Sequence, residues 1–203
     1  MKHQPKEKTP PDVETLVKFQ GGRSFEATFK ATFQMGVAVD QILKKDLYSL
    51  GASYTQKVFE QSVPANTFEA CFIFNKTLVM TDVCQIHENG SYTIFEVKNS
   101  MEEKEVFIQD MAIQYFVCSH AQKGLKQFNL VLPAEDGGFR IIDKTEVLKQ
   151  YVPKLELLIP EFIELLKMND EPDIAMGEQC YHPYKCEFIE YCTKELLKKS
   201  ELF

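Results

Sequence analysis

The 203-residue chain has a net charge of −7, and 44% of its residues are hydrophobic, which suffices for one globular domain with a sizeable core. It has no run of about 18 apolar residues, and its first residues lack the apolar segment of a secretory signal, so we expect no membrane partner and a cytoplasmic protein. Only two of the 23 basic residues are arginines, which argues against a large DNA-coating surface. An enzyme that engages a short stretch of backbone through a metal and a local basic patch fits this balance.

The predicted elements begin after residues 1–12, which are rich in Lys and Pro and which we expect to be disordered or a linker. Residues 24–34 predict a helix, because Phe25 and Phe29 recur at helical spacing. Glu26 lies beside this stripe in the first turn, where a carboxylate often complements the helix dipole. The pattern further predicts strands at 37–39, 67–74, 125–132 and 139–142, a hairpin at 77–98, and helices at 46–61, 105–122 and, divided by prolines, 144–167.

This order of elements predicts an α/β (α+β) fold with one mixed β-sheet flanked by helices. We expect the core to span residues 13–174. Three of the six cysteines crowd into residues 175–203, a segment whose aromatic residues predict that it packs on the core. The other three, Cys71, Cys84 and Cys118, lie in apolar runs and are expected to be ordinary core residues.

The hairpin carries charges where apolar residues are usual. Asp82 lies within an apolar run, and Glu96 and Lys98 fall on one face of the second strand. Charges in such surroundings are costly unless they are paired or bind a metal. Two carboxylates with a backbone carbonyl suit Mg²⁺ or Mn²⁺, and a neighbouring lysine can orient a water or offset developing charge. The spacing therefore predicts metal-assisted attack on a phosphodiester.

The hairpin loop decides whether the two carboxylates can share a metal. A two-residue turn, the usual choice for Asn-Gly at residues 89–90, would place Asp82 and Glu96 on opposite faces. A three-residue loop over residues 88–90, with Gly90 in the left-handed conformation, makes them face each other. We therefore predict the three-residue loop, or a bulge with the same effect.

These charged positions resemble the motif of the PD-(D/E)XK nuclease superfamily: Asp82 on one strand and Glu96, Val97 and Lys98 on the next. The resemblance implies a restriction-endonuclease-like core. It also implies that Asp82, Glu96 and the carbonyl of Val97 hold the metal, while Lys98 positions the nucleophilic water.

Two helices extend the resemblance to the RecB-like branch. The sequence DMAIQYF resembles its glutamine-bearing helix, which implies that Gln114 orients Lys98 or a phosphate. Glu26 matches the acidic residue of the family's first helix, where RecB-like members often have histidine, and would bind the metal directly or through water. Glu69 is a weaker candidate, expected to be a strand-face carboxylate with a basic partner. The family's tyrosine four residues after the glutamine is replaced by Cys118.

The tail GEQCYHPYKCEFIEYC resembles the cysteine motif of the iron–sulfur subset, which includes CRISPR-associated RecB-like exonucleases. The resemblance implies that Cys180, Cys186 and Cys192 hold a [4Fe–4S] cluster. The family's fourth cysteine precedes the core, and this chain has none before Cys71, so we expect the sequence to begin downstream of it. A Cys₃His zinc site that includes His182, or a tail without metal, are the alternatives.

The sequence thus predicts a metal-dependent deoxyribonuclease, an exonuclease or single-strand nuclease that acts on single-stranded DNA or ends. The family resemblance implies protein partners in DNA repair or CRISPR adaptation. Intact Asp82, Glu96 and Lys98 favour the enzyme. The acidic balance and the missing cysteine favour a nucleic-acid-binding or assembly module that keeps the fold without turnover. A generic α+β domain with coincidental motifs is the third interpretation.

Overall fold

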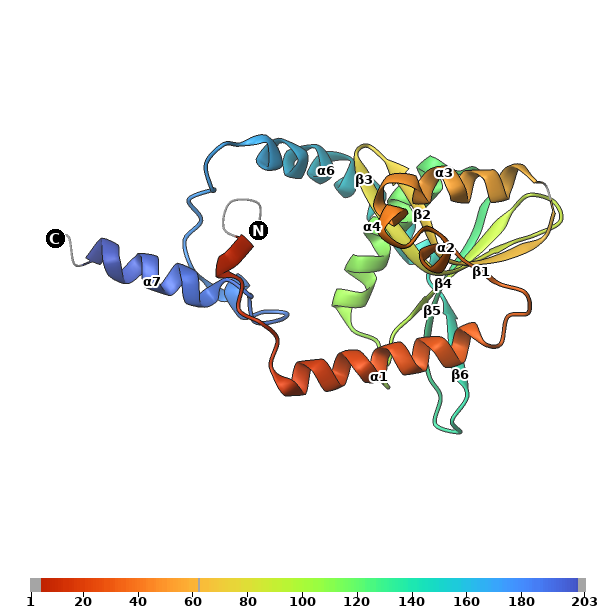
Figure 1. Ribbon diagram of the computed structural model, residues 1–203, viewed down its shortest axis with the longest axis horizontal. Helices are drawn as coiled ribbons and strands as arrows, with labels where there is room; N and C mark the ends of the chain where they lie inside the picture. The colour runs from red at the N-terminus through yellow and green to blue at the C-terminus, as the bar shows by residue number, and fades with distance from the viewer. Residues whose placement is uncertain (1–4, 62, 201–203) are drawn as a thin grey trace. The chain divides into compact units, whose positions relative to one another are not determined.

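The computed structural model describes residues 5–61 and 63–200 of the chain (Figure 1). Two compact units are present: Gln20–Pro160 form one, and Met1–Phe19 with Glu161–Phe203 form the other. The boundaries therefore differ from the expected division after residues 12 and 174. Within the described ranges, no helix is both long enough and apolar enough to cross a bilayer.

The larger unit is built on a single mixed sheet, which confirms the predicted α/β class. Its strands lie in the order β1-β2-β3-β4-β5-β6 (Figure 1). Pairing is parallel between β1 and β2 and between β4 and β5, and antiparallel elsewhere. The strand bounds are Val37–Ala38, Ala65–Phe74, Thr77–Ile86, Tyr92–Val97, Leu125–Pro133 and Phe139–Asp143.

The β3–β4 loop has the predicted three-residue form. The N–H of His87 donates to the carbonyl of Ser91 over 2.8 Å, and the N–H of Gly90 donates to the carbonyl of His87 over 2.9 Å. Gly90 has a φ of +75°, in the left-handed region that glycine adopts without strain. The register predicted from the sequence is therefore confirmed.

The first helix begins earlier than predicted: α1 spans Val13–Lys30, whereas the sequence predicted 24–34. The side chain of Asp12 accepts a hydrogen bond from the N–H of Thr15 over 2.8 Å, which caps the N-terminus of this longer helix. Gly21 and Gly22 lie inside this helix. Each glycine costs about 1 kcal/mol of helix stability relative to alanine, so the sequence did not predict a helix across them.

Helices cover both faces of the sheet in the larger unit. Phe29 of α1 packs on one face in a cluster with Val83, Val97 and Val131. On the other face, the rings of Phe59 of α3 and Tyr92 of β4 lie 5.2 Å apart, and the Tyr92 hydroxyl donates to the Cys118 carbonyl of α4 over 2.8 Å. The segment predicted as a helix divided by prolines, residues 144–167, forms two helices, α5 and α6, which separate before Pro153 as predicted. Pro160 does not divide the segment further, because it lies within α6. The helix bounds are Val39–Leu43 (α2), Leu47–Glu60 (α3), Glu105–Ala121 (α4), Thr145–Lys149 (α5), Val152–Lys167 (α6) and Ile189–Ser200 (α7), with short 3₁₀ turns at Pro5–Glu7, Lys44–Asp46 and Glu178–Cys180.

The N-terminal segment of the smaller unit is bonded to the cysteine-rich segment. The N–H of Thr9 donates to the carbonyl of Glu187 over 2.8 Å, and the ammonium of Lys8 lies 2.9 Å from the Glu187 carboxylate. The sequence predicted disorder or a linker for residues 1–12; in the described part of this segment, these two contacts join it to Glu187. The backbone hydrogen bond and the ion pair fix this segment next to Cys186.

Candidate active site

Asp82 and Glu96 lie where two neighbouring strands separate. The last β3–β4 pair is Val83–Phe95; before it in sequence β3 pairs only with β2, and after it β4 pairs only with β5. One step beyond that pair, the register places Asp82 and Glu96 in facing positions. The N–H of Val97 donates to Asp82 Oδ2 over 2.7 Å instead of to a strand partner. The separation therefore leaves two carboxylates beside an open end of the ladder.

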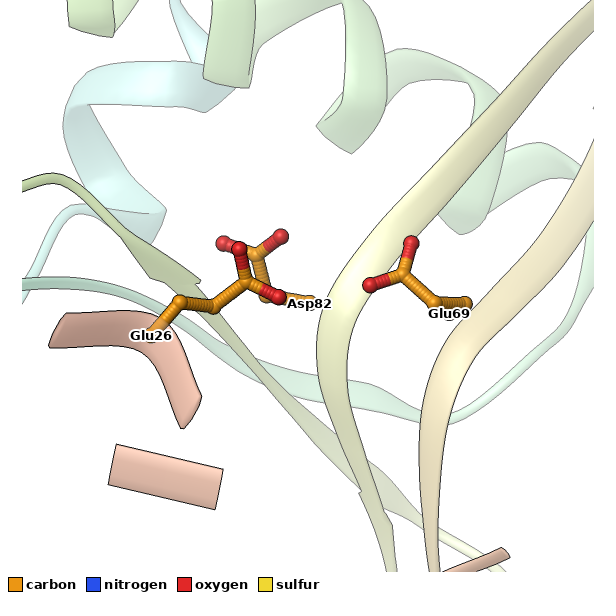
Figure 2. Close-up of side chains that lie close together, drawn as sticks. All are labelled: Glu26, Glu69 and Asp82. Carbon is orange, nitrogen blue, oxygen red and sulfur yellow. The ribbon is translucent and has the colours of Figure 1, made fainter. Parts of the chain in front are cut away.

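Asp82 also belongs to a cluster of three carboxylates. Glu26 of α1, Glu69 of β2 and Asp82 each offer an oxygen, and these atoms all lie within 4.8 Å of one another (Figure 2). Glu69 has a φ of +54° and interrupts the β2–β3 pairing between Phe68 and Ala70. The left-handed conformation costs a non-glycine residue roughly 1–2 kcal/mol, so the surrounding contacts must hold Glu69 in place.

Lys30 is the cation of this cluster. Its Nζ bonds to Oε1 of Glu26, four residues earlier on α1, and lies 2.5 Å from Oε1 of Glu69. Burial alone would lower the pKa of the Lys30 ammonium, but the two carboxylates outweigh it and raise the pKa above the usual value. Glu69 thus has the basic partner expected of it. Lys30 itself was missed, although its i,i+4 spacing from Glu26 could have indicated the pair.

The Asp82 carboxyl is held in an environment that opposes its charge. Burial raises its pKa well above the usual range, and the charges of Glu96, Glu26 and Glu69 raise it further. The hydrogen bond from the N–H of Val97 lowers it only in part. A carboxylate in this position is stabilised by a nearby cation, because a cation removes the repulsion that raises its pKa.

Glu96 and Lys98 form an ion pair beside Asp82. Glu96 is 5% exposed, and its Oε1 lies 2.8 Å from Lys98 Nζ. Lys98 Nζ also lies 2.7 Å from Oδ2 of Asp110 on α4, a residue that the sequence analysis missed. Burial acts to lower the pKa of Lys98, but Glu96 and Asp110 raise it far above neutral pH. Both carboxylates thus stabilise the ammonium form of Lys98.

Two buried oxygens of this site have no partner. In the described part of the chain, Glu96 Oε2 and Gln114 Oε1 are buried without a hydrogen bond. Such groups are costly in a protein interior and mark places where a ligand, ion or water belongs. Because the strand register places Glu96 opposite Asp82, whose pKa the Glu96 charge raises, the donor set fits a hard divalent cation, which prefers oxygen ligands.

The structure brings most of the predicted site residues together in the larger unit. Burial raises the pKa of the Glu96 carboxyl, and Gln114 acts in the opposite direction and lowers it. Gln114 itself is buried, with 7% of its surface exposed. Glu26 lies near Asp82 as a member of the carboxylate cluster, and Glu96 is not a member of that cluster. The residues that converge around the end of the β3–β4 ladder are Glu26, Lys30, Glu69, Asp82, Glu96, Val97, Lys98, Asp110 and Gln114.

The three C-terminal cysteines form a separate group in the smaller unit. Each is half-buried with a free thiol, and the N–H of Cys186 donates to the carbonyl of Cys180 over 2.8 Å. Burial raises the pKa of the Cys192 thiol, and the charges of Cys186 and Cys180 raise it further. The other cysteines, Cys71, Cys84 and Cys118, are buried in the larger unit, as the sequence predicted.

Comparisons with known proteins were made for the whole chain. No family model matches it, and the comparison with curated proteins gives no match. Chains of known structure do match, and one of them is the crystal structure of SSO0001, with 12% sequence identity and a TM-score of 0.34. That match covers 88% of this chain and 97% of the other. A TM-score of this size is too low to support a function, which therefore depends on the geometry of the site.

Proposed function

We propose that this chain is a metal-dependent nuclease that hydrolyses DNA phosphodiesters in single strands or at ends. The observation that carries the proposal is the facing pair Asp82 and Glu96 at the separation of β3 and β4, with a buried, unpartnered oxygen on Glu96. Lys98 lies directly beside this pair. Carboxylates, an ammonium and an unfilled acceptor in one place suit the charge changes of phosphodiester cleavage.

Asp82, Glu96 and the carbonyl of Val97 would hold Mg²⁺ or Mn²⁺. When bound there, the ion supplies Lewis-acid chemistry: it polarises the phosphodiester and lowers the pKa of a water. The bond from the N–H of Val97 to Asp82 orients that carboxylate before any ligand arrives. The site is therefore preorganised on two strands rather than on loops.

Lys98 would stabilise negative charge and orient the nucleophilic water. Its raised pKa keeps it protonated at neutral pH, so it donates hydrogen bonds and cannot accept the proton of the water. Asp110 and Glu96 hold its Nζ at 2.7 and 2.8 Å, and Gln114 lies next to Glu96. In this proposal Asp110 and Gln114 are positioning residues, because they act through Lys98 and Glu96.

We also propose that Cys180, Cys186 and Cys192 provide three ligands of a [4Fe–4S] cluster. Iron–sulfur clusters are held by cysteine thiolates, usually four. The thiols of Cys180, Cys186 and Cys192 would supply three of them, and the charges of Cys186 and Cys180 act on Cys192. Visible absorption of anaerobically purified protein tests this proposal: absorption in the visible range that Cys186→Ala removes is expected, and a colourless wild type would contradict it.

The proposed activity is tested with labelled single-stranded and double-stranded DNA, in Mn²⁺ or in chelator. We expect cleavage in Mn²⁺ that chelator and Asp82→Asn both abolish. Asp143→Asn is the matched control, because Asp143 also accepts backbone N–H donation near a strand end but lies outside the site. Absence of metal-dependent cleavage by the folded protein would overturn the enzyme proposal.

A second candidate is a nucleic-acid-binding or assembly module without turnover. It is favoured by the internal ion pairs, since Lys30 and Lys98 already neutralise part of the site's charge. The same assay separates the two candidates: the module would bind labelled DNA equally in Mn²⁺ and in chelator and would release no cleaved product.

A further inference from the structure

Lys30 occupies a position that a second metal ion would need. Its Nζ bonds to Oε1 of Glu26 and to Oε1 of Glu69, and those two residues belong to the carboxylate cluster with Asp82. Mg²⁺ binds its oxygen ligands at about 2.0–2.1 Å. An ion between the same two oxygens would therefore overlap the ammonium, so that Lys30 and a metal at this place exclude each other.

The ammonium is well held in its place. The side chain of Lys30 is 16% exposed, and its two carboxylate partners are 26% and 25% exposed. The two partners come from different elements, α1 and β2, so movement of either partner alone leaves the other contact in place.

Asp82 and Glu96 lie outside this pairing. Lys30 contacts neither of them, and Glu96 Oε2 is buried without a partner. A divalent ion can bind there without displacing Lys30. The two sides of the site thus differ: one already contains its cation, and the other can accept one.

We propose that Lys30 is a resident cation that restricts this site to a single divalent ion, held by Asp82 and Glu96. The inference rests on the proposed metal-dependent function and specifies how many ions that function uses. Removal of the Lys30 charge leaves Glu26, Glu69 and Asp82 as three uncompensated carboxylates within 4.8 Å, and a second ion then enters there.

The test is the number of Mn²⁺ ions bound per chain, measured by isothermal titration calorimetry and by electron paramagnetic resonance without DNA. We expect one ion for the wild type and two for Lys30→Met, with spin coupling between the two because they share Asp82. Lys18→Met is the matched control: Lys18 pairs with Glu14 at the same i,i+4 spacing on the same helix, at 2.7 Å, but both of these side chains are exposed. It should bind one ion, with an affinity within about twofold of the wild type.

Each outcome is decisive. Two ions in the wild type, or one ion in Lys30→Met, would overturn the inference and leave the nuclease proposal intact. No ion in the wild type would overturn both. If Lys30→Met does not fold, Lys30→Gln provides the same neutral comparison and should bind two ions. Lys30→Arg keeps the charge and should bind one.

Discussion

Asp82→Asn should stabilise the metal-free protein while it abolishes metal binding. Asparagine keeps an oxygen that can accept the N–H of Val97, so the substitution removes charge and preserves the hydrogen bond. Because the pKa of Asp82 is raised, its charged form is disfavoured in the folded state, and this destabilisation appears as the pH rises through the folded pKa. At lower pH the carboxyl is protonated, and the gain from asparagine should vanish.

The magnitude follows from the cluster geometry. Two unit charges 4.8 Å apart repel by about 3 kcal/mol at an effective dielectric constant of about 20. Asp82 has such neighbours in Glu26 and Glu69, and Lys30 offsets part of their charge. A net gain of about 1–3 kcal/mol remains, which corresponds to about 3–9 °C in Tm for a chain of this size.

The assay is thermal unfolding in chelator from about pH 5 to about pH 8, repeated with Mn²⁺. The gain of Asp82→Asn in chelator should grow with pH, and Mn²⁺ should raise the Tm of the wild type alone. Asp143→Asn is the control of opposite sign: hydrogen bonds from Thr145 offset the desolvation of Asp143 and lower its pKa, so its loss should destabilise slightly. A loss of stability for Asp82→Asn in chelator at high pH would refute the reasoning, because Asp82 would then be a structural carboxylate.

Three further substitutions test the site and its hairpin. Lys98→Ala should keep Mn²⁺ binding by calorimetry yet lower the cleavage rate by roughly 10² or more, the scale for one preorganised electrostatic group; near-normal cleavage would remove Lys98 from the mechanism. Lys76→Gly should stabilise the protein by about 0.5–1 kcal/mol in urea unfolding. Asn75 and Lys76 form the β2–β3 turn with φ values of +45° and +60°, and glycine is favoured at the second position of a turn in which both φ values are positive. Gly90→Ala should cost about 1 kcal/mol in the same experiment, from backbone strain alone, since nothing lies within 4 Å of an added Cβ. Equal stability of Gly90→Ala and the wild type would contradict the left-handed loop.

Local sequence patterns were sufficient for much of the fold. Alternating apolar residues predicted the strands of the hairpin, and the requirement that Asp82 face Glu96 predicted the three-residue loop that ends at Gly90. Both depend on contacts between residues close in sequence, for which side-chain period and turn chemistry are reliable guides. Helix α1 was only half predicted, because Gly21 and Gly22 weaken the local signal that packing then overrides.

The composition of the site was decided by tertiary structure. Asp82, Glu96 and Lys98 follow from one hairpin, whereas Lys30 and Glu69 meet across 39 residues of sequence and Lys98 and Asp110 meet between a strand and a helix. The unusual backbone at Glu69, which turns its carboxylate toward Asp82, has no signature in a strand-like sequence. The sequence by itself therefore determined the pair of carboxylates and their register. Only the packing of α1 and α4 around the sheet decided which cations neutralise them, because ion pairs between distant segments exist only once the chain is folded.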